Sequence, residues 1–268
     1  MDVLGLDRQS ARMEVRLLLA TLANKSPSWV MAHEQDVLAP HEENGFQDML
    51  KRRLSGEPIA YILGHREFFG RVFSITPDVL IPRPETELLV ELVLEKCRGR
   101  NTLDLLDLGT GSGCIAITLA LNCPTAKVAA VDNSLKALEM ARKNAQQLDA
   151  VVEFIHGNWF EPLTGRKFDM IVANPPYISP MDPHLRQGDV RFEPRNALVA
   201  REFGLAHIRS IVEQAKSHLK SEGLLVLEHG YDQSAQVRAL MKKSGYAEVE
   251  SRRDLSDIER VTLAKMSE

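Results

Sequence analysis

Residues 103–108 read Leu-Asp-Leu-Leu-Asp-Leu, and residues 109–113 continue as Gly-Thr-Gly-Ser-Gly. The first six residues form a mainly apolar run with the length of a buried strand, and the glycine-rich stretch is typical of a tight turn. Residues 115–121 lead on from the turn as an apolar helix. A strand that enters a helix through such a turn is the usual first unit of a parallel sheet with helical crossovers.

The same alternation of strands and helices continues along the chain. Strands are predicted at residues 128–132, 153–155, 170–173 and 224–227, and helices at 135–148 and 208–219. Alternation of this kind builds a parallel sheet that is covered by helices on both faces. Two last strands, at 247–250 and 261–265, are close enough in sequence to pair antiparallel at one edge. The prediction is a doubly wound, mainly parallel α/β domain.

The residues before this domain follow a helical pattern and then a strand pattern. Apolar residues in 12–20 and 42–54 recur at helical spacing, and residues 59–63 and 71–75 flank a turn-rich segment that we expect to be a hairpin. We therefore divide the chain into a small N-terminal helical domain with a hairpin (1–77), a proline-rich linker (78–86) and the α/β domain (87–268). The run Lys51-Arg52-Arg53 is predicted to be a solvated helix face.

Length and composition agree with a globular protein of two domains. The chain has 268 residues, of which 44% are hydrophobic, and a net charge of −4. This charge argues against a protein that is held to nucleic acid mainly by phosphate contacts, so we expect no direct nucleic-acid partner. The 3 cysteines form no Cys-x-x-Cys pair and the 8 histidines show no short ligand spacing, so neither a disulfide framework nor a metal site is predicted.

The start of the chain does not have the pattern of a secretory signal. No apolar run approaches the roughly 20 residues that are needed to span a bilayer. We therefore expect a cytoplasmic protein without a membrane partner, and we expect a monomer.

The glycine turn and an acid on the next strand predict a nucleoside-bearing cofactor. Asp132 ends the second strand about 20 residues after the turn, where a carboxylate accepts hydrogen bonds from a ribose diol. In a dinucleotide fingerprint the third glycine would stand at position 114, which is Cys114, a residue that we expect to be small and buried. Asp107 before the turn would repel a pyrophosphate but can bind an ammonium group, directly or through water. These features favour S-adenosylmethionine.

The residues predicted to hold this cofactor lie at one end of the sheet. Trp159 follows the third strand and is predicted to pack near the adenine. The predicted cofactor residues are Gly109, Thr110, Gly111, Ser112, Gly113, Asp132 and Trp159.

The fourth strand ends in Asn174-Pro175-Pro176-Tyr177, which we interpret as the catalytic and substrate-binding element. Proline lacks a backbone donor, so the Pro175 carbonyl is expected to be presented outward. With the Asn174 carboxamide, that carbonyl can hold a planar NH2 group by both hydrogens and direct its nitrogen at an electrophilic methyl. Tyr177 supplies a flat face on which a planar amide or base can stack.

These segments resemble the protein-(glutamine-N5) methyltransferases that modify peptide-chain release factors, the PrmC/HemK family. The resemblance covers nearly the whole chain, and its most specific parts are Pro-Arg-Pro-Glu-Thr-Glu at 82–87 and Asn-Pro-Pro-Tyr at 174–177. It implies a class I, Rossmann-like S-adenosylmethionine-dependent methyltransferase fold. It also implies that Asn174 lines the cofactor site, and that the N-terminal helical domain helps to dock a class 1 release factor.

The resemblance implies methyl transfer to the side-chain amide of the glutamine in the Gly-Gly-Gln motif of these factors, without a titrating general base. The alternative activities are adenine amino-methylation in DNA or RNA, methylation of a ribosomal-protein glutamine, dinucleotide-dependent dehydrogenation, and non-catalytic binding. The balanced net charge disfavours adenine methylation, and the Pro-Arg-Pro-Glu-Thr-Glu motif of the linker disfavours a ribosomal-protein substrate. The spacing of the glycines disfavours a dehydrogenase, and the intact Asn174 disfavours a protein that only binds. For Arg83 and Glu85 two interpretations are open: the residues close over the active site, or they form ion pairs that hold the linker.

Overall fold

The structure is a computed structural model and describes residues 4–267. The chain divides into two compact units. One comprises Met1–Arg66 together with Pro183–Phe192, and the other comprises Glu67–Asp182 and Glu193–Glu268. The boundary between the two units lies between residues 66 and 67, and ten residues of the C-terminal half pack with the N-terminal unit.

The N-terminal unit is helical. Its elements are α1 (Arg8–Ala23), α2 (Pro27–Ala32), α3 (Pro40–Leu54), α4 (Ile59–Leu63), η3 (Pro183–Arg186) and η4 (Asp189–Phe192). Polar side chains cap the first two helices: Asp7 accepts hydrogen bonds from the first turn of α1, and Ser26 accepts one from the Trp29 amide in α2. Such caps satisfy amide groups that have no partner within the helix.

The strand expected at residues 59–63 is wrong, because this segment is α4. Ala60, Tyr61 and Ile62 are all buried, and a short run that is apolar on every side does not distinguish a helix from a strand. Gly64, with a φ of 75°, ends the helix in the left-handed conformation. The hairpin follows at once, as β1 (His65–Phe68) and β2 (Arg71–Ser74).

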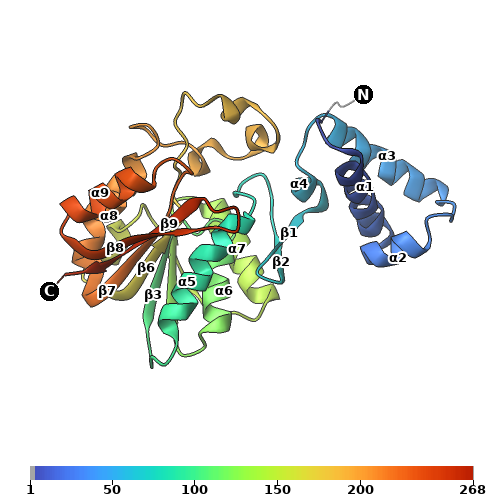
Figure 1. Cartoon of the computed structure of the whole chain (residues 1–268). Coiled ribbons are helices and arrows are strands. Elements are labelled where there is room, and N and C mark those ends of the chain that lie inside the picture. Colours follow the sequence, from blue (N-terminus) through green and yellow to red (C-terminus); the bar gives the residue numbers. More distant parts are fainter. Residues whose placement is uncertain (1–3, 268) are drawn as a thin grey trace. The chain divides into compact units, whose positions relative to one another are not determined.

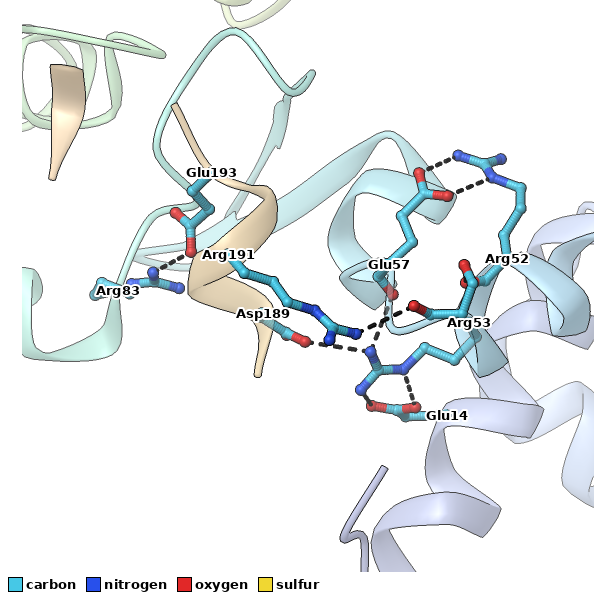
Figure 2. Close-up of polar contacts among 9 residues, drawn as sticks. Glu14, Arg52, Arg53, Glu57, Arg83, Asp189, Arg191 and Glu193 are labelled. Carbon is cyan, nitrogen blue, oxygen red and sulfur yellow. Dashed lines mark hydrogen bonds and ion pairs between the residues drawn. The ribbon is translucent and has the colours of Figure 1, made fainter. Parts of the chain in front are cut away.

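The expectation of a solvated face at Lys51-Arg52-Arg53 is also wrong for one of the three residues. Lys51 and Arg52 are exposed, but Arg53 is only 6% exposed. Its guanidinium donates to both carboxylate oxygens of Glu14 in α1, to the Glu57 carbonyl and to Asp189 in η4 (Figure 2). A guanidinium has five donors in a rigid fork, so it can join several segments while buried.

The second unit is built on a seven-stranded sheet (Figure 1). Its strands are β3 (Asp104–Leu108), β4 (Lys127–Asp132), β5 (Glu153–His156), β6 (Phe168–Ala173), β7 (Leu219–Glu228), β8 (Tyr246–Arg253) and β9 (Glu259–Met266). The strand order is β5-β4-β3-β6-β7-β9-β8. The first five strands are parallel, and β9 and β8 add an antiparallel edge, which confirms the predicted sheet.

Helices cover both faces of this sheet (Figure 1). They are α5 (Glu87–Cys97), α6 (Cys114–Asn122), α7 (Leu135–Gln147), α8 (Ala206–His218) and α9 (Ser234–Lys243), with short 3-10 turns η1 (Pro84–Thr86), η2 (Glu161–Leu163) and η5 (Arg195–Ala197). Leu105 on β3 packs in the core beneath α5 and α6, whereas Leu106 packs in the core beneath α8 and α9. Successive residues of the strand therefore serve opposite layers.

From Glu67 on, the hairpin β1–β2 belongs to this second unit. Phe68 and Phe73 are 1% and 0% exposed and lie in the same apolar core as α5 and α6. Their rings meet edge to face at 6.1 Å. The Asn144 carboxamide on α7 also exchanges two hydrogen bonds with the backbone of Ser74.

The register of the sheet brings the two predicted motifs together. Leu108 at the end of β3 pairs with Ala173 at the end of β6. The glycine turn and the Asn-Pro-Pro-Tyr element therefore begin side by side at the carboxyl edge of adjacent strands. The strand order reverses at this point, which is where open α/β sheets bind their ligands.

Candidate functional site

The glycine turn after β3 is fixed by the neighbouring strand β4. The amides of Gly109 and Thr110 both donate to the carbonyl of Val131. Gly113 has a φ of 83°, and a Cβ there would lie 2.8 Å from the Ile117 side chain and 3.1 Å from the Ala141 methyl. A Cβ at Gly111 would meet no atom of residues 4–267 within 4 Å. Gly113 therefore permits close packing of α6 on α7, and Gly111 leaves open space at the turn.

Asp132 at the end of β4 ties the turn to the next strand. Its Oδ2 accepts from the Gly111 amide at 2.8 Å, and its Oδ1 accepts from the Ser134 amide at 2.8 Å. Burial raises the pKa of Asp132, and these amide hydrogen bonds oppose that rise. The carboxylate thus has a fixed orientation and keeps further lone pairs for a ligand.

Asp107 lies directly before the turn and is fully buried. The Thr110 hydroxyl donates to its Oδ2 at 2.7 Å, but its Oδ1 has no hydrogen-bond partner in the described part of the chain. Burial raises the pKa of this carboxyl to about 7. A buried carboxyl oxygen without a donor is costly, so this atom has an unmet demand for a donor or a cation.

A pocket opens at this edge of the sheet, and it contains part of the predicted set. Six of the predicted residues line it: Gly109, Gly111, Asp132, Trp159, Asn174 and Pro176. Five others do not: Thr110, Ser112, Gly113, Pro175 and Tyr177. Thr110 and Ser112 are buried behind the turn, where Thr110 donates to Asp107 and the Ser112 carbonyl accepts from Asn144.

Trp159 stands beside the turn at the wall of the pocket. Its ring lies 3.4 Å from where a Cβ of Gly109 would be, and its centroid is 5.5 Å from that of His207. Sequence reasoning missed His207, whose pKa is lowered by burial, because nothing in its neighbours distinguishes it from other helix-start histidines. Also missed were the pocket residues at the start of the linker, Asp78, Val79 and Leu80, and those in η5, Asn196 and Ala197.

Asn174 and Tyr177 make contacts that the sequence did not reveal. The Asn174 Nδ2 donates to the Thr86 hydroxyl at 3.1 Å, and the Tyr177 hydroxyl donates to Glu228 Oε1 at 3.2 Å. Glu228 is 1% exposed, and burial raises its pKa to about 7 against the opposing effect of the Thr86 and Tyr177 hydroxyls. Thr86 lies in the Pro-Arg-Pro-Glu-Thr-Glu segment, and this position is the one feature of the sequence that pointed to Thr86 as a site residue.

Of the two linker residues Arg83 and Glu85, Arg83 forms an ion pair. Its guanidinium pairs with Glu193, whose carboxylate is buried and also accepts from the Ile81 amide at 3.1 Å (Figure 2). Glu85 is exposed. The pair fixes the linker to the segment that follows η4.

The described residues were expected to contain neither a metal site nor a membrane-spanning helix. Residues 4–267 contain no group of three or more His, Cys, Asp or Glu side chains that could hold a metal ion. Over the same range, no helix has both the length and the apolar composition to cross a membrane. Cys114 is buried, as predicted.

The residues of the pocket fit the predicted cofactor. Gly111 leaves space where a ligand can approach the backbone, and Asp132 presents an oriented carboxylate to the same pocket. Asp107 does not line the pocket, but a water could bridge its orphan oxygen and an ammonium group. A pyrophosphate would place negative charge beside both acids, so these residues fit it poorly.

Two protein-family models match the chain. The methyltransferase small domain matches residues 84–188, and the PrmC N-terminal domain matches residues 5–64. The second match ends close to the boundary between the two compact units.

Among solved structures, similarity extends to the fold alone. A methyltransferase from Pyrococcus furiosus has a TM-score of 0.57 and 18% identity, covering 83% of this chain and 100% of that one. The 16S rRNA N2 G1207 methyltransferase of Thermus thermophilus, solved with AdoMet and guanosine, has a TM-score of 0.55 and 20% identity, covering 75% of this chain and 49% of that one.

Curated relatives match over nearly the full length. The release factor glutamine methyltransferase of Bordetella pertussis is 48% identical over 94% of this chain and 93% of its own. Its namesake from Pseudomonas aeruginosa is 48% identical over 97% and 94%, and that from Salmonella typhimurium is 44% identical over 97% and 94%. Such identity over both units shows that the chain belongs to the release factor glutamine methyltransferase family.

Proposed function

We propose that this protein transfers a methyl group from S-adenosylmethionine to the side-chain amide nitrogen of the glutamine in the Gly-Gly-Gln motif of class 1 peptide-chain release factors. The observation that carries the proposal is the joint presence of Asp132, the glycine turn and Asn174 in one pocket at the switch point of the sheet. Relatives with 44–48% identity carry the name release factor glutamine methyltransferase.

In this proposal the turn and its two acids hold the cofactor. Asp132 accepts from the ribose hydroxyls, Asp107 attracts the ammonium group through water, and Trp159 packs near the adenine. Thr110, Ser112 and Gly113 hold the turn in shape without lining the pocket. S-adenosylmethionine, when bound, supplies the methyl: the amide nitrogen bonds to its carbon, the methyl–sulfur bond breaks, and one amide proton is released.

The Asn-Pro-Pro-Tyr element positions the glutamine. Asn174 and the Pro175 carbonyl accept from the two amide hydrogens, Pro176 lines the pocket, and Tyr177 packs on the planar amide. Holding both hydrogens directs the nitrogen at the methyl carbon. No residue is assigned as a titrating base, because the proton leaves after the nitrogen has bonded to carbon.

The remaining partners follow from the same proposal. The N-terminal helical unit docks the release factor, the protein acts in the cytoplasm as a monomer, and no nucleic acid binds directly. The relatives' names support the release factor as substrate. The net charge of −4 supports a protein substrate over a polyanion.

A transfer assay with four acceptors tests the proposal. The protein is incubated with methyl-labelled cofactor and, separately, with purified class 1 release factor, ribosomal proteins, duplex DNA or ribosomal RNA. We expect one methyl group on the release factor and none on the other three. Comparable labelling of a nucleic acid or of a ribosomal protein, with none on the release factor, would overturn the proposed substrate.

A further inference from the structure

The far end of the Asn-Pro-Pro-Tyr element lies beyond the hydrogen bonds of the sheet. The parallel pairing of β6 with both of its neighbours, β3 and β7, ends at Ala173. Pro175 and Pro176 have no backbone N–H, so neither can donate to a continued ladder. The position of Tyr177, which the proposed function places on the substrate amide, therefore depends on contacts from other segments.

Gln233 supplies one of these contacts. It lies in the turn between β7 and α9 and is only 6% exposed. Its Nε2 donates to the Tyr177 carbonyl at 3.0 Å and to the Phe203 carbonyl at 3.2 Å. The two hydrogens of one NH2 group thus serve two backbone carbonyls, one in the Asn-Pro-Pro-Tyr element and one in the turn before α8.

The oxygen of the same carboxamide fixes its orientation. The Gly230 amide donates to Gln233 Oε1 at 2.9 Å, and the Gln233 amide donates to the Gly230 carbonyl at 3.0 Å. A backbone N–H can only donate and a backbone carbonyl can only accept, so these partners permit a single orientation of the carboxamide. The NH2 group of Gln233 must therefore face Tyr177.

The turn at residues 202–204 packs against the same carbonyl. Glu202, Phe203 and Gly204 have φ values of 55°, 55° and 89°. A Cβ at Gly204 would lie 2.1 Å from the Tyr177 carbonyl oxygen and 2.5 Å from Gln233 Nε2. Left-handed backbone is unfavourable for residues other than glycine and persists where the surrounding structure holds it. Gln233 holds this turn through the Phe203 carbonyl.

Tyr177 is also held at the other end of its side chain. Its hydroxyl donates to Glu228 Oε1 at 3.2 Å. Glu228 is the last residue of β7, just ahead of the turn that contains Gln233. One segment of the chain therefore bonds both to the main chain of Tyr177 and to the tip of its ring, which limits the positions that the ring can take.

We propose that Gln233 is a positioning residue for methyl transfer. It fixes the Tyr177 carbonyl, so that the Tyr177 ring lies where it packs on the substrate amide. Gln233 is outside the set of residues that line the pocket, so it acts through Tyr177 and not by touching cofactor or substrate. This inference rests on the proposed function, in which Tyr177 packs on the glutamine amide.

The substitution Gln233→Glu tests this role. It keeps the shape of the side chain and the acceptor for Gly230, but it replaces the NH2 group by an oxygen that faces two carbonyl oxygens. We expect kcat for release-factor methylation to fall about tenfold or more, with cofactor Kd and KM for the release factor within about twofold of wild type. Gln214→Glu is the matched control, because Gln214 is exposed on α8 and donates to the Ser210 hydroxyl. Its kcat should be unchanged.

The Tyr177→Ala background separates positioning from general damage to the fold. If Gln233 acts through the Tyr177 ring, Gln233→Glu should lower kcat strongly in the natural background and by less than about twofold in Tyr177→Ala. Gln233→Met keeps the length of the side chain and adds no charge, so it takes the place of Gln233→Glu if that variant fails to bind cofactor. An equal loss of kcat in both backgrounds, or no loss in a variant that binds cofactor normally, would overturn this role of Gln233.

The wild-type assay distinguishes the two levels of the proposal. A wild-type protein that leaves the release factor unmethylated overturns the proposed function and, with it, this role of Gln233. A wild-type protein that methylates the factor, together with fully active Gln233→Glu and Gln233→Met variants, overturns the positioning role alone.

Discussion

Asp132 shows how a single residue serves both the fold and the proposed chemistry. Both of its carboxylate oxygens accept backbone amides, one from Gly111 and one from Ser134, and the residue also lines the pocket. The sequence predicted its ribose-binding role from its place after a strand. It did not predict that the same carboxylate fixes the turn, because that contact depends on the distance between two strands.

Asp132→Ala is expected to weaken S-adenosylmethionine binding by roughly 1.5–3 kcal/mol, the range for a lost hydrogen bond to a charged group. Isothermal calorimetry measures the change directly. NAD should not compete for the site in the wild-type protein. An unchanged affinity in Asp132→Ala would remove this residue from the ribose role, and competition by NAD would favour the dehydrogenase alternative.

Asp107 predicts a pH-dependent stability difference. Burial raises its pKa to about 7, so the folded chain holds a proton that the unfolded chain has lost, and folding is penalised increasingly as the pH rises from about 4 to about 7. In the absence of cofactor, Asp107→Asn removes this penalty. The variant should therefore gain about 1–3 kcal/mol of unfolding free energy relative to wild type between pH 5 and pH 8, measured by urea titration.

Asp169→Asn provides the control for that measurement. Although burial alone would raise the pKa of Asp169, hydrogen bonds from Lys220 and the Asp104 amide lower it. This carboxyl is ionised in both folded and unfolded chains from pH 5 to pH 8, so its variant should differ from wild type by a constant amount. A constant difference for Asp107→Asn as well would contradict a buried, proton-binding Asp107.

At the scale of elements, alanine substitutions at the last two glycines of the turn should affect different properties, stability in one case and cofactor affinity in the other. Gly113→Ala places a Cβ against Ile117 and Ala141 and should cost about 1–3 kcal/mol of stability from overpacking. Gly111→Ala meets no such contact within residues 4–267 and should cost about 1 kcal/mol for its left-handed backbone. Cofactor affinity should fall more in Gly111→Ala, because its methyl group occupies the open side of the turn.

Thermal unfolding and cofactor titration of both variants check this contrast. The expected pattern is a less stable Gly113→Ala with nearly normal affinity once folded, and a more stable Gly111→Ala with weakened affinity. The reverse pattern would mean that Gly113, and not Gly111, faces the ligand.

Arg53 should be the strongest single anchor of the N-terminal unit that we can test. Arg53→Met leaves the Glu14 carboxylate and Asp189 without this partner and should destabilise the unit by about 3–5 kcal/mol. Arg12→Met is the control, since Arg12 is 62% exposed and its surface pair with Glu34 should contribute little to stability. The protein has 2 tryptophans, so Trp29 fluorescence in a Trp159→Phe background reports this unit.

The segment 183–192 supplies a second readout of the same change. It reaches α3 through Asp189 and through Arg191, which donates to the Ser55 carbonyl (Figure 2). Arg53→Met should speed its cleavage in limited proteolysis, and Arg12→Met should not. Equal stability and equal cleavage in the two variants would show that Arg53 is not an anchor.

Across the whole molecule, the parts that sequence could predict are those governed by local pattern. The alternation of strands and helices predicted a mainly parallel sheet with an antiparallel edge, but not the order of its strands. The motifs that follow β3 and β6 predicted a ligand site at the carboxyl edge of the sheet, where a pocket lies. Segment 183–192 could not be assigned to the N-terminal unit, because its partners are more than 100 residues away. The contacts of Thr86 with Asn174 and of Glu228 with Tyr177 were also missed, because they join residues that are 88 and 51 positions apart in the sequence.

The central claim is that the methyl acceptor is one side-chain amide. Wild-type protein is incubated with labelled S-adenosylmethionine and a class 1 release factor, and tryptic peptides are mapped by mass spectrometry. A second factor, in which the Gly-Gly-Gln glutamine is replaced by alanine, serves as the control. A single methyl group on that glutamine's side-chain nitrogen, and none on the alanine factor, is the predicted result; labelling of the alanine factor to the same extent would contradict the account.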